Sequence, residues 1–575
     1  MHWLNSHSFR IPGRVTGLVC TAVVVAALSA KSDGLMSSSP RFYDDDPVLT
    51  EMDTKDASAV QERKINLIYH QSKHLFATPG DTDDRRALNV NTVDEVPDSS
   101  WFVDRILARN SPSMTPQDVA RGPDAGRGPA PGPWIVLSSK RQGITPGFTV
   151  LDANRDRWVI KVDPPSNPEM ASGAEVVVTK LFHAMGYHVP ENAIATMHRE
   201  DLVLTNESTT IGMNGSERRM REDDLDAMLR GAARRPDGSY RVLASRLLPG
   251  RPLGGFYYYG TRSDDPNDVV PHEHRRELRG LRVFASWVNH HDVIAINTLD
   301  TLVPEGNRRV VRHHLIDFGS TLGSAAIRPR RFDHGHQYAV ERRSLLSDSL
   351  SLGLHVRPFE RVRYRDLPAV GRFSADRFDP ARWKPEVPNP AFLRARADDL
   401  FWGARRVMAF TDEMIGAAVA SASYSDERAA RHVTQTLIAR RDLIGRTWLA
   451  SVNPIVDPSF DGKVLLFRNA AIDAGVAAAP SAYVVSWARF DNATDATTNL
   501  GVTKASDPRI AAPADLPIVV GSYIRLEISA TGGPASWAEP VHAYFRRQPG
   551  GWTLVGFDRV PSDNLAASKG AQGRR

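Results

Sequence analysis

A lysine and a glutamate, fourteen positions apart, form the first pair of residues whose types and spacing could do chemistry. Lys161 lies in the run 157–162, where alternating apolar residues predict a strand with the lysine facing away from the apolar side. Glu175 lies in a predicted helix over residues 171–185, on the same stripe as Phe182. Because a buried carboxylate is costly unless it is paired, we expect Glu175 to orient the Lys161 ammonium toward a phosphate group.

A histidine, an aspartate and an asparagine follow a predicted amphipathic helix over residues 274–289. As His290, Asp292 and Asn297, they have the spacing H-x-D-x-x-x-x-N. In this pattern Asp292 would accept or orient the proton of a substrate hydroxyl, Asn297 would bind a metal ion, and His290 would brace the loop. The alternative is an ordinary polar loop after a helix, where Asp and Asn are common.

An aspartate at the end of a predicted strand completes the set. Asp317 follows the strand over residues 310–316 and precedes Phe318 and Gly319, and the glycine permits a sharp turn. A carboxylate in such a position is suited to bind magnesium. Phosphoryl transfer needs a cation on the phosphates, a metal held by a carboxylate, and a carboxylate beside the attacking hydroxyl. The chain offers all of these parts, so they point to phosphoryl transfer.

The order of these motifs is the one that protein kinases use, and residues 134–324 resemble the protein-kinase-like fold. The resemblance is to its atypical branch, near the HipA-like and phosphoinositide-kinase-like enzymes. It implies an α+β fold with two lobes: an N-lobe over residues 134–255 and a mainly helical C-lobe over residues 256–455, joined by a hinge near residues 245–250. It also implies ATP as the phosphate donor, Mg²⁺ as the metal, and a protein or small-molecule hydroxyl acceptor of unidentified class.

The resemblance also assigns a role to each residue of the set. Asp292 would be the catalytic residue, and Asn297 and Asp317 would bind the metal. The cofactor-binding residues would be Lys161, Glu175, Gly143 and Gly147.

Several features depart from the kinase pattern. Residues 140–148 stand where a phosphate-covering loop is expected, but they lack the motif G-x-G-x-x-G. The backbone amides around Gly143 and Gly147 could still cover phosphates. His291 replaces the usual arginine before Asp292, and no A-P-E segment follows the Asp-Phe-Gly motif. These departures disfavour a conventional protein kinase and leave the acceptor open.

Hydrophobic periodicity predicts the elements that must position these residues. The predicted strands of the first part are residues 134–138, 148–151, 157–162, 241–248 and 310–316. The region beyond residue 328 is predicted to be mainly helical, with its clearest helices at residues 401–414 and 427–448. Short alternating runs then predict a small all-β domain over residues 456–562, a sandwich or a barrel, followed by a flexible tail over residues 563–575.

The N-terminal 30 residues have the layout of a secretory signal peptide or a membrane anchor. Arg10 and Arg14 precede an apolar run over residues 15–30, which would place the rest of the chain in the periplasm or at the cell surface. The alternative is a mis-assigned start codon upstream of a cytoplasmic protein. Residues 31–133 are predicted to form a polar leader, an ordered arm and a Pro/Gly-rich linker.

Composition excludes some classes of function. The 575-residue chain has a net charge of +5 and no dense basic stripe, which disfavours nucleic-acid binding. Its one cysteine, Cys20, leaves no disulfide framework or cysteine-ligated zinc site in the folded part.

Two other functions stay open at the level of sequence. A metal phosphohydrolase would use the His291-Asp292 pair, with further ligands from His272, His274, His313 and His314. A non-catalytic, exported kinase-fold scaffold would instead use the terminal β domain as its contact surface.

Overall fold

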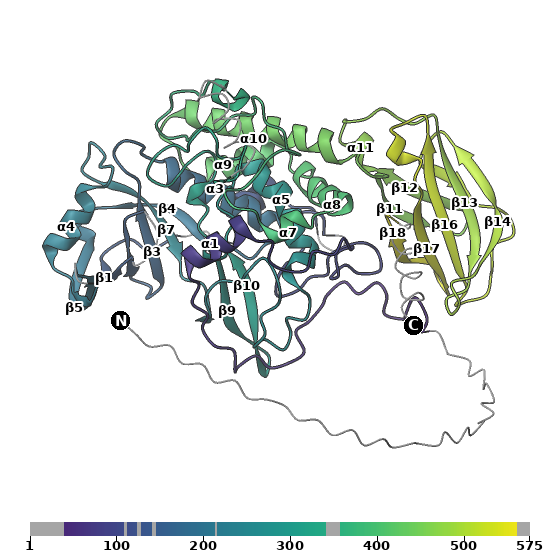
Figure 1. Ribbon diagram of the computed structural model, residues 1–575, viewed down its shortest axis with the longest axis horizontal. Helices are drawn as coiled ribbons and strands as arrows, with labels where there is room; N and C mark the ends of the chain where they lie inside the picture. Colours follow the sequence, from purple (N-terminus) through teal and green to yellow (C-terminus); the bar gives the residue numbers. More distant parts are fainter. Residues whose placement is uncertain are drawn as a thin grey trace, which may run out of the picture.

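The computed structural model describes residues 39–560 apart from 109–111, 124–127, 141–144, 213–214 and 341–356. The predicted signal peptide or anchor, the predicted tail and Gly143 therefore lie outside the described residues. Within the described part, no helix combines the length and the apolar character needed to cross a bilayer. The protein is a mixed α/β protein with several sheets, and Figure 1 shows a helical region between two groups of strands.

A seven-stranded sheet occupies the first part of the fold, in the order β4-β7-β3-β2-β1-β5-β6. Its strands are β1 (Trp134–Ser139), β2 (Gly147–Leu151), β3 (Arg157–Val162), β4 (Asn192–Met197), β5 (Leu202–Ile211), β6 (Glu217–Arg219) and β7 (Tyr240–Arg246). The pairing of β1 with β5 is parallel, and the other pairings are antiparallel. In β3, Trp158 and Ile160 are buried on one face as the alternation predicts, so Lys161 faces the other side.

Helices cover both faces of this sheet. Helix α4 (Glu222–Arg230) contributes Leu225 and Leu229 to the apolar cluster that contains Trp158 and Ile160. Helix α3 (Met170–Met185) belongs instead to the main core, and almost all of its residues are buried. The sheet therefore separates one core from another, and α3 lies on the side that Lys161 faces.

Some elements in this part were not predicted from the sequence: β4, β5, β6 and α4. β5 contains the polar run Thr205–Ser208 and has only two fully buried positions, so its alternation is weak. β6 is three exposed residues long. Such strands are specified by their pairing with neighbours rather than by their own pattern.

The middle of the chain is built from helices around a hairpin. The helices are α5 (Arg276–Val288), α7 (Pro390–Leu393), α8 (Ala397–Met408), α9 (Asp412–Ala420) and α10 (Glu427–Trp448). Two further helices come from the N-terminal part, α1 (Leu67–Phe76) and α2 (Pro116–Arg121), and α2 packs against α9. The hairpin consists of β9 (Thr298–Glu305) and β10 (Arg308–Leu315), with the two-residue β8 (Arg251–Pro252) on its edge. The single helix predicted over residues 401–414 is in fact two, because Thr411 caps the N-terminus of α9 through the backbone amide of Met414.

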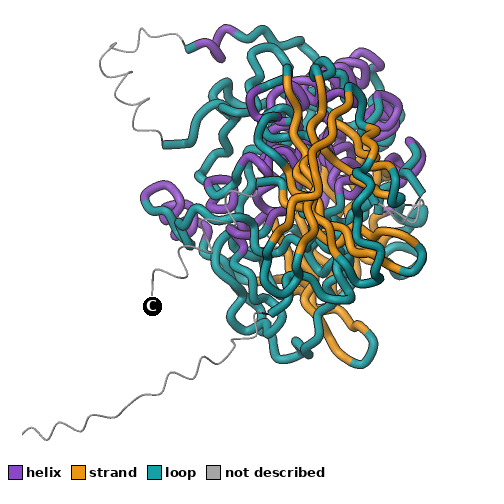
Figure 2. Tube along the Cα trace, turned by 90° about the vertical axis from the view of Figure 1, so that its right-hand side faces the viewer, coloured by secondary structure: helices purple, strands orange, loops and turns teal. Residues whose placement is uncertain are grey.

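The last part of the chain is all-β apart from the short helix α11 (Ala470–Asp473). One sheet has three strands, β11 (Ile455–Phe460), β12 (Val464–Asn469) and β15 (Arg509–Ala511). The other has five, in the order β14-β13-β16-β17-β18: β13 (Ala482–Phe490), β14 (Thr497–Ala505), β16 (Tyr523–Thr531), β17 (Val541–Gln548) and β18 (Gly551–Asp558). Figure 2 shows the long strands of this domain side by side.

The segment that precedes the seven-stranded sheet lies against the β domain and the helical region. Phe42, expected in a polar leader, is buried in the β domain, where its ring lies 5.1 Å from that of Tyr544. Further on, Asp94 accepts hydrogen bonds from Arg86 (2.6 Å), Arg276 (2.7 Å) and Arg559 (3.2 Å). One buried carboxylate thus joins the N-terminal arm, helix α5 and the end of the β domain.

Candidate active site

Lys161, Glu175 and Asp317 converge at one point between the seven-stranded sheet and the helical region. Lys161 Nζ donates to Glu175 Oε1 at 2.7 Å and Oε2 at 2.8 Å, and to Asp317 Oδ1 at 2.9 Å. The side chains of Lys161 and Glu175 are 11% and 3% exposed, whereas that of Asp317 is 44% exposed. The expected pair of Lys161 with Glu175 is therefore present, and Asp317 is the most exposed of the three side chains.

The position of Glu175 depends on how helix α3 begins. Its N-terminus has no capping side chain of its own, because the residue before it, Glu169, is in the left-handed region. Instead Asp163, from the end of β3, accepts hydrogen bonds from the backbone amides of Glu169, Ala171 and Ser172 at 3.1–3.2 Å. A carboxylate at a helix N-terminus satisfies free amides and the helix dipole. The strand that carries the lysine therefore also anchors the helix that carries its partner.

Asp317 is held at the open end of the β9–β10 hairpin. The backbone amide of Ile316 donates to the carbonyl of Asn297 at 3.0 Å, one step beyond the last paired residues of the two strands. Asp317 itself has φ 62°, in the left-handed region that Asp tolerates better than most residues. A Cβ at Gly319 would lie 3.1 Å from Glu175 Oε2, so glycine leaves room for the buried glutamate.

The loop before the hairpin carries Asp292 and Asn297. The side-chain amide of Asn297 donates to the backbone carbonyl of Asp292 at 2.8 Å, which closes the loop on itself. Burial, together with the nearby carboxylate of Glu386, raises the pKa of Asp292 to about 7. A carboxylate with a pKa near neutrality is well matched to exchange a proton with a hydroxyl group.

His290 and His291 support this loop in different ways. His290 is buried against the rings of Phe182 and Phe318, and burial lowers its pKa to about 3. It is therefore neutral at physiological pH and packs as an aromatic residue, as expected for a brace. His291 Nε2 lies 2.7 Å from Nδ1 of His334, so one ring donates to the other.

The charges of the cluster reinforce one another. Burial alone would lower the pKa of Lys161, but Asp317 and Glu175 outweigh it and raise that pKa above its ordinary value. The Lys161 ammonium in turn lowers the pKa of Asp317. Burial raises the pKa of Glu175 against the pull of Lys161. Lys161 and Asp317 therefore stay ionised at neutral pH.

Of the two glycines proposed to cover phosphates, the structure describes only Gly147. Gly143 lies outside the described residues. Gly147 pairs with Lys161 across β2 and β3, and a Cβ at Gly147 would lie 2.2 Å from the carbonyl oxygen of Ile160. The close approach of two strands is thus a sufficient reason for glycine at this position.

A second lysine near the cluster was not singled out from the sequence. The backbone amide of Lys140, just after β1, donates to the carbonyl of Gly147 at 2.8 Å, and Gly147 lies opposite Lys161 on the next strand. Its ammonium donates to the carbonyl of Thr145 at 3.3 Å, and its charge interacts with those of Asp317 and Lys161. The register of β1, β2 and β3 is what brings Lys140 close to Lys161.

The four further histidines of the hydrolase alternative are bonded to four different partners. Each makes its own contact: His272 with Asp268, His274 with Asp81, His313 with Asp300, and His314 with the carbonyl of Leu299. Within the described residues, no three His, Cys, Asp or Glu side chains are grouped so that they could hold a metal ion.

No family model matches the chain, and no curated protein matches it. Among solved structures, the chain is similar to the Helicobacter pylori proinflammatory kinase CtkA, with 11% identity over 53% of this chain and 92% of that one, at a TM-score of 0.28. It is also similar to the Golgi casein kinase with Mn/ADP bound, with 9% identity over 69% and 94% of the two chains, at a TM-score of 0.29. Both neighbours are kinases.

Proposed function

We propose that this protein is an atypical kinase-like phosphotransferase, which moves the γ-phosphoryl group of ATP to a hydroxyl acceptor. The observation that carries the proposal is the convergence of Lys161, Glu175 and Asp317 from three separate elements, with Lys161 Nζ within 2.9 Å of both carboxylates. Phosphoryl transfer needs a lysine for the phosphates and a carboxylate for the metal, and Lys161 and the partly exposed Asp317 bring both to one point. The Asp292 loop adds a group suited to the acceptor hydroxyl.

Each residue has a definite task in this proposal. Lys161 binds the phosphates of ATP, and Glu175 holds the lysine in place. The hydroxyl oxygen of the acceptor forms a bond to the γ-phosphorus, while the bond from that phosphorus to the β–γ bridging oxygen breaks. ADP leaves with that electron pair, and the hydroxyl proton passes to the carboxylate of Asp292.

The residues present fit a magnesium ion. Asp317 stays ionised beside Lys161 and presents the exposed side of the cluster. Asp317 and Asn297 supply two oxygen donors from adjacent positions of the hairpin, and Mg²⁺ commonly takes one or two protein ligands with water and phosphates completing its shell. When bound, the ion would offset the charge of the phosphates.

Binding of radiolabelled ATP, with and without MgCl₂, tests the proposal. We expect the wild-type chain to bind ATP in a magnesium-dependent way and Asp317→Ala to lose that dependence. Asp515→Ala, which removes an exposed carboxylate in the β domain, is the matched control and should bind like wild type. The absence of magnesium-dependent binding in the wild-type chain would overturn the proposal, and hydrolysis of phosphate monoesters without ATP would favour the hydrolase instead.

Binding without turnover would favour the scaffold alternative. In that case ATP would protect the protein against unfolding, but no ADP would form with any acceptor tested. The two measurements therefore separate a nucleotide-binding scaffold from a phosphotransferase.

A further inference from the structure

A cavity of about 740 Å³ lies beside the loop that carries Asp292. Its wall includes Asn289, whose Oδ1 accepts a hydrogen bond from Trp383 Nε1 at 2.9 Å, and His334, which contacts His291 at 2.7 Å. Asn289 and His291 are both within three positions of Asp292 in the sequence. The cavity thus shares a wall with the proposed catalytic loop.

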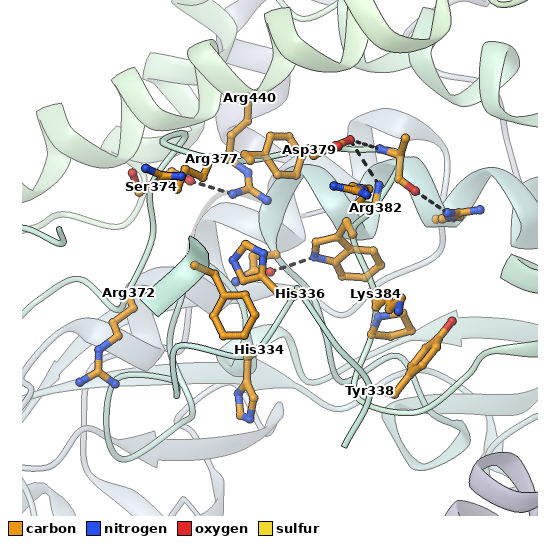
Figure 3. A pocket seen from close by; sticks show the side chains of 18 of the residues that line it. His334, His336, Tyr338, Arg372, Ser374, Arg377, Asp379, Arg382, Lys384 and Arg440 are labelled. Atoms are coloured by element: carbon orange, nitrogen blue, oxygen red, sulfur yellow. Dashed lines mark hydrogen bonds between the residues drawn. The ribbon is translucent and has the colours of Figure 1, made fainter. Parts of the chain in front are cut away.

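The lining of the cavity is strongly cationic. Two of its side chains are acidic, Asp376 and Asp379, and its histidines are neutral because burial lowers the pKa of each to about 4. Six are basic: Arg282, Arg372, Arg377, Arg382, Lys384 and Arg440. Five of the six are arginines, and within the described residues none of these arginines forms a salt bridge with a carboxylate. Figure 3 shows several of them around the cavity.

Arg440 is the most deeply buried of these cations. It extends from α10 into the cavity wall and donates to the backbone carbonyls of Trp287 (2.8 Å), Ser374 (2.8 Å) and Ser286 (2.5 Å). Its guanidinium also lies 3.5 Å from the centroid of the Phe378 ring. Carbonyl dipoles satisfy its N–H groups but do not neutralise its charge, so the wall keeps a positive field.

Aromatic rings form much of the rest of the wall. The ring of His336 stacks on that of Phe359 with centroids 4.9 Å apart, and Trp383 is fixed by its bond to Asn289. The acidic Asp379 is tied to its own turn, where Oδ1 accepts from the backbone amide of Ala381 at 3.0 Å. Arg377 and Arg382 are exposed and form no ion pair within the described residues, so they can offer their guanidinium groups to a ligand.

We propose that this cavity binds the acceptor, and that the acceptor is a small organic anion carrying a hydroxyl group, such as a phosphate monoester or a hydroxycarboxylate. The proposal rests on the proposed phosphotransferase function. A volume of about 740 Å³ lies within the range of small-molecule sites, which favours a small molecule over an extended peptide. Arginines recognise carboxylate and phosphate through paired hydrogen bonds, and the shared wall brings the bound hydroxyl close to the catalytic loop.

Calorimetric titration of the full chain with glycerol 3-phosphate and with citrate tests this proposal. The first probe is a phosphorylated hydroxyl compound and the second is a carboxylated one. The two titrations therefore show whether the cavity prefers a phosphate or a carboxylate. The double variant Arg377→Gln/Arg382→Gln removes two exposed cations of the cavity. We expect at least about tenfold weaker binding of one of the probes to this variant, since two charge-assisted contacts are lost.

Two controls make the result specific. Arg489→Gln/Arg509→Gln removes the same charge from exposed positions of the β domain and should bind the probes like wild type. Glycerol, which has no charge, should not bind measurably. Magnesium-dependent ATP binding should be the same in the cavity variant and the wild type, because neither substituted arginine lies at the Lys161 cluster.

The outcomes separate this proposal from the proposed function. If neither probe binds the wild type, or if the cavity variant binds both as tightly as wild type, the cavity is not an anion site. Binding of a hexaglutamate peptide in preference to both probes would overturn the small-molecule acceptor. If ATP does not bind but the probes bind wild type and not the cavity variant, the phosphotransferase proposal fails while the anion site stands.

Discussion

Lys161 Nζ lies 2.9 Å from Asp317 Oδ1, although 156 positions separate the two residues in the chain. The contact joins strand β3 to the turn after strand β10, and Glu175 of α3 shares the same ammonium. A cluster of this kind ties the seven-stranded sheet to the helical region through charge as well as packing. It also gives several substitutions effects that can be predicted.

Replacing Lys161 by methionine should lower both stability and nucleotide binding. Glu175 and Asp317 would then face each other without a cation, and removing one partner of a buried ion pair costs about 3–5 kcal/mol. Urea unfolding should show this loss, and ATP binding should fall with it. Lys463→Met, an exposed lysine in the β domain, is the control and should change neither quantity. Unchanged stability in Lys161→Met would contradict the structural role given to the lysine.

Asp292→Asn should lower turnover far more than nucleotide affinity. The amide keeps the size of the side chain but cannot accept the hydroxyl proton, and general-base groups contribute about 10²–10⁴-fold to rates. Steady-state turnover and equilibrium ATP binding, measured on the same preparation, check this prediction. Equal losses in the two measurements would show that Asp292 acts on the nucleotide rather than on the acceptor.

The main effect of Gly147→Ala should be a loss of stability rather than a loss of phosphate binding. The new Cβ would lie 2.2 Å from the carbonyl oxygen of Ile160, and such overpacking typically costs about 1–3 kcal/mol. The control is Gly416→Ala, because that helical glycine has no heavy atom within 4 Å of an added Cβ and alanine favours helix. We expect the midpoint of thermal unfolding to fall for the first variant and to stay level or rise for the second.

Asp94→Asn should lower the free energy of unfolding by an amount that depends on pH, because Asp94 links the N-terminal segment, α5 and the end of the β domain. Burial would raise the pKa of Asp94, but Arg276, Arg86 and Arg559 outweigh it and hold that pKa well below its ordinary value. A carboxyl with a lowered folded-state pKa contributes stability that is complete above the unfolded value and is lost as pH falls through the folded one.

Asp94→Asn should lower the free energy of unfolding by about 3–5 kcal/mol, the cost of breaking a buried ion pair. This loss should be the same at pH 7 and pH 5.5. It should shrink below about pH 4, where the unfolded carboxyl takes up its proton. Urea titrations at several pH values give this difference, and Asp515→Asn serves as the exposed control. A difference that already shrinks between pH 7 and 5.5 would contradict the lowered pKa.

Local pattern was sufficient to predict part of the cluster. Alternation in β3 placed Lys161 opposite the apolar face, and helical spacing placed Glu175 on a buried stripe, so their pairing could be predicted. Asp163 was not predicted as the cap of α3, because its partners lie six to nine positions away across a turn whose path the sequence does not show. Lys140 was missed for a similar reason, since only strand register places it near Lys161.

What the sequence by itself determined was therefore the types and order of the reactive residues and the elements that carry them. The tertiary structure decided which of them meet: it brought Asp317 to Lys161, gave each histidine of the hydrolase alternative a different partner, and buried Phe42 in the β domain. It alone assembled the cationic cavity, whose arginines come from α5, from residues 372–382 and from α10. Periodicity reports how a residue faces within its own element, whereas contacts between distant elements depend on how those elements pack, which no local pattern contains.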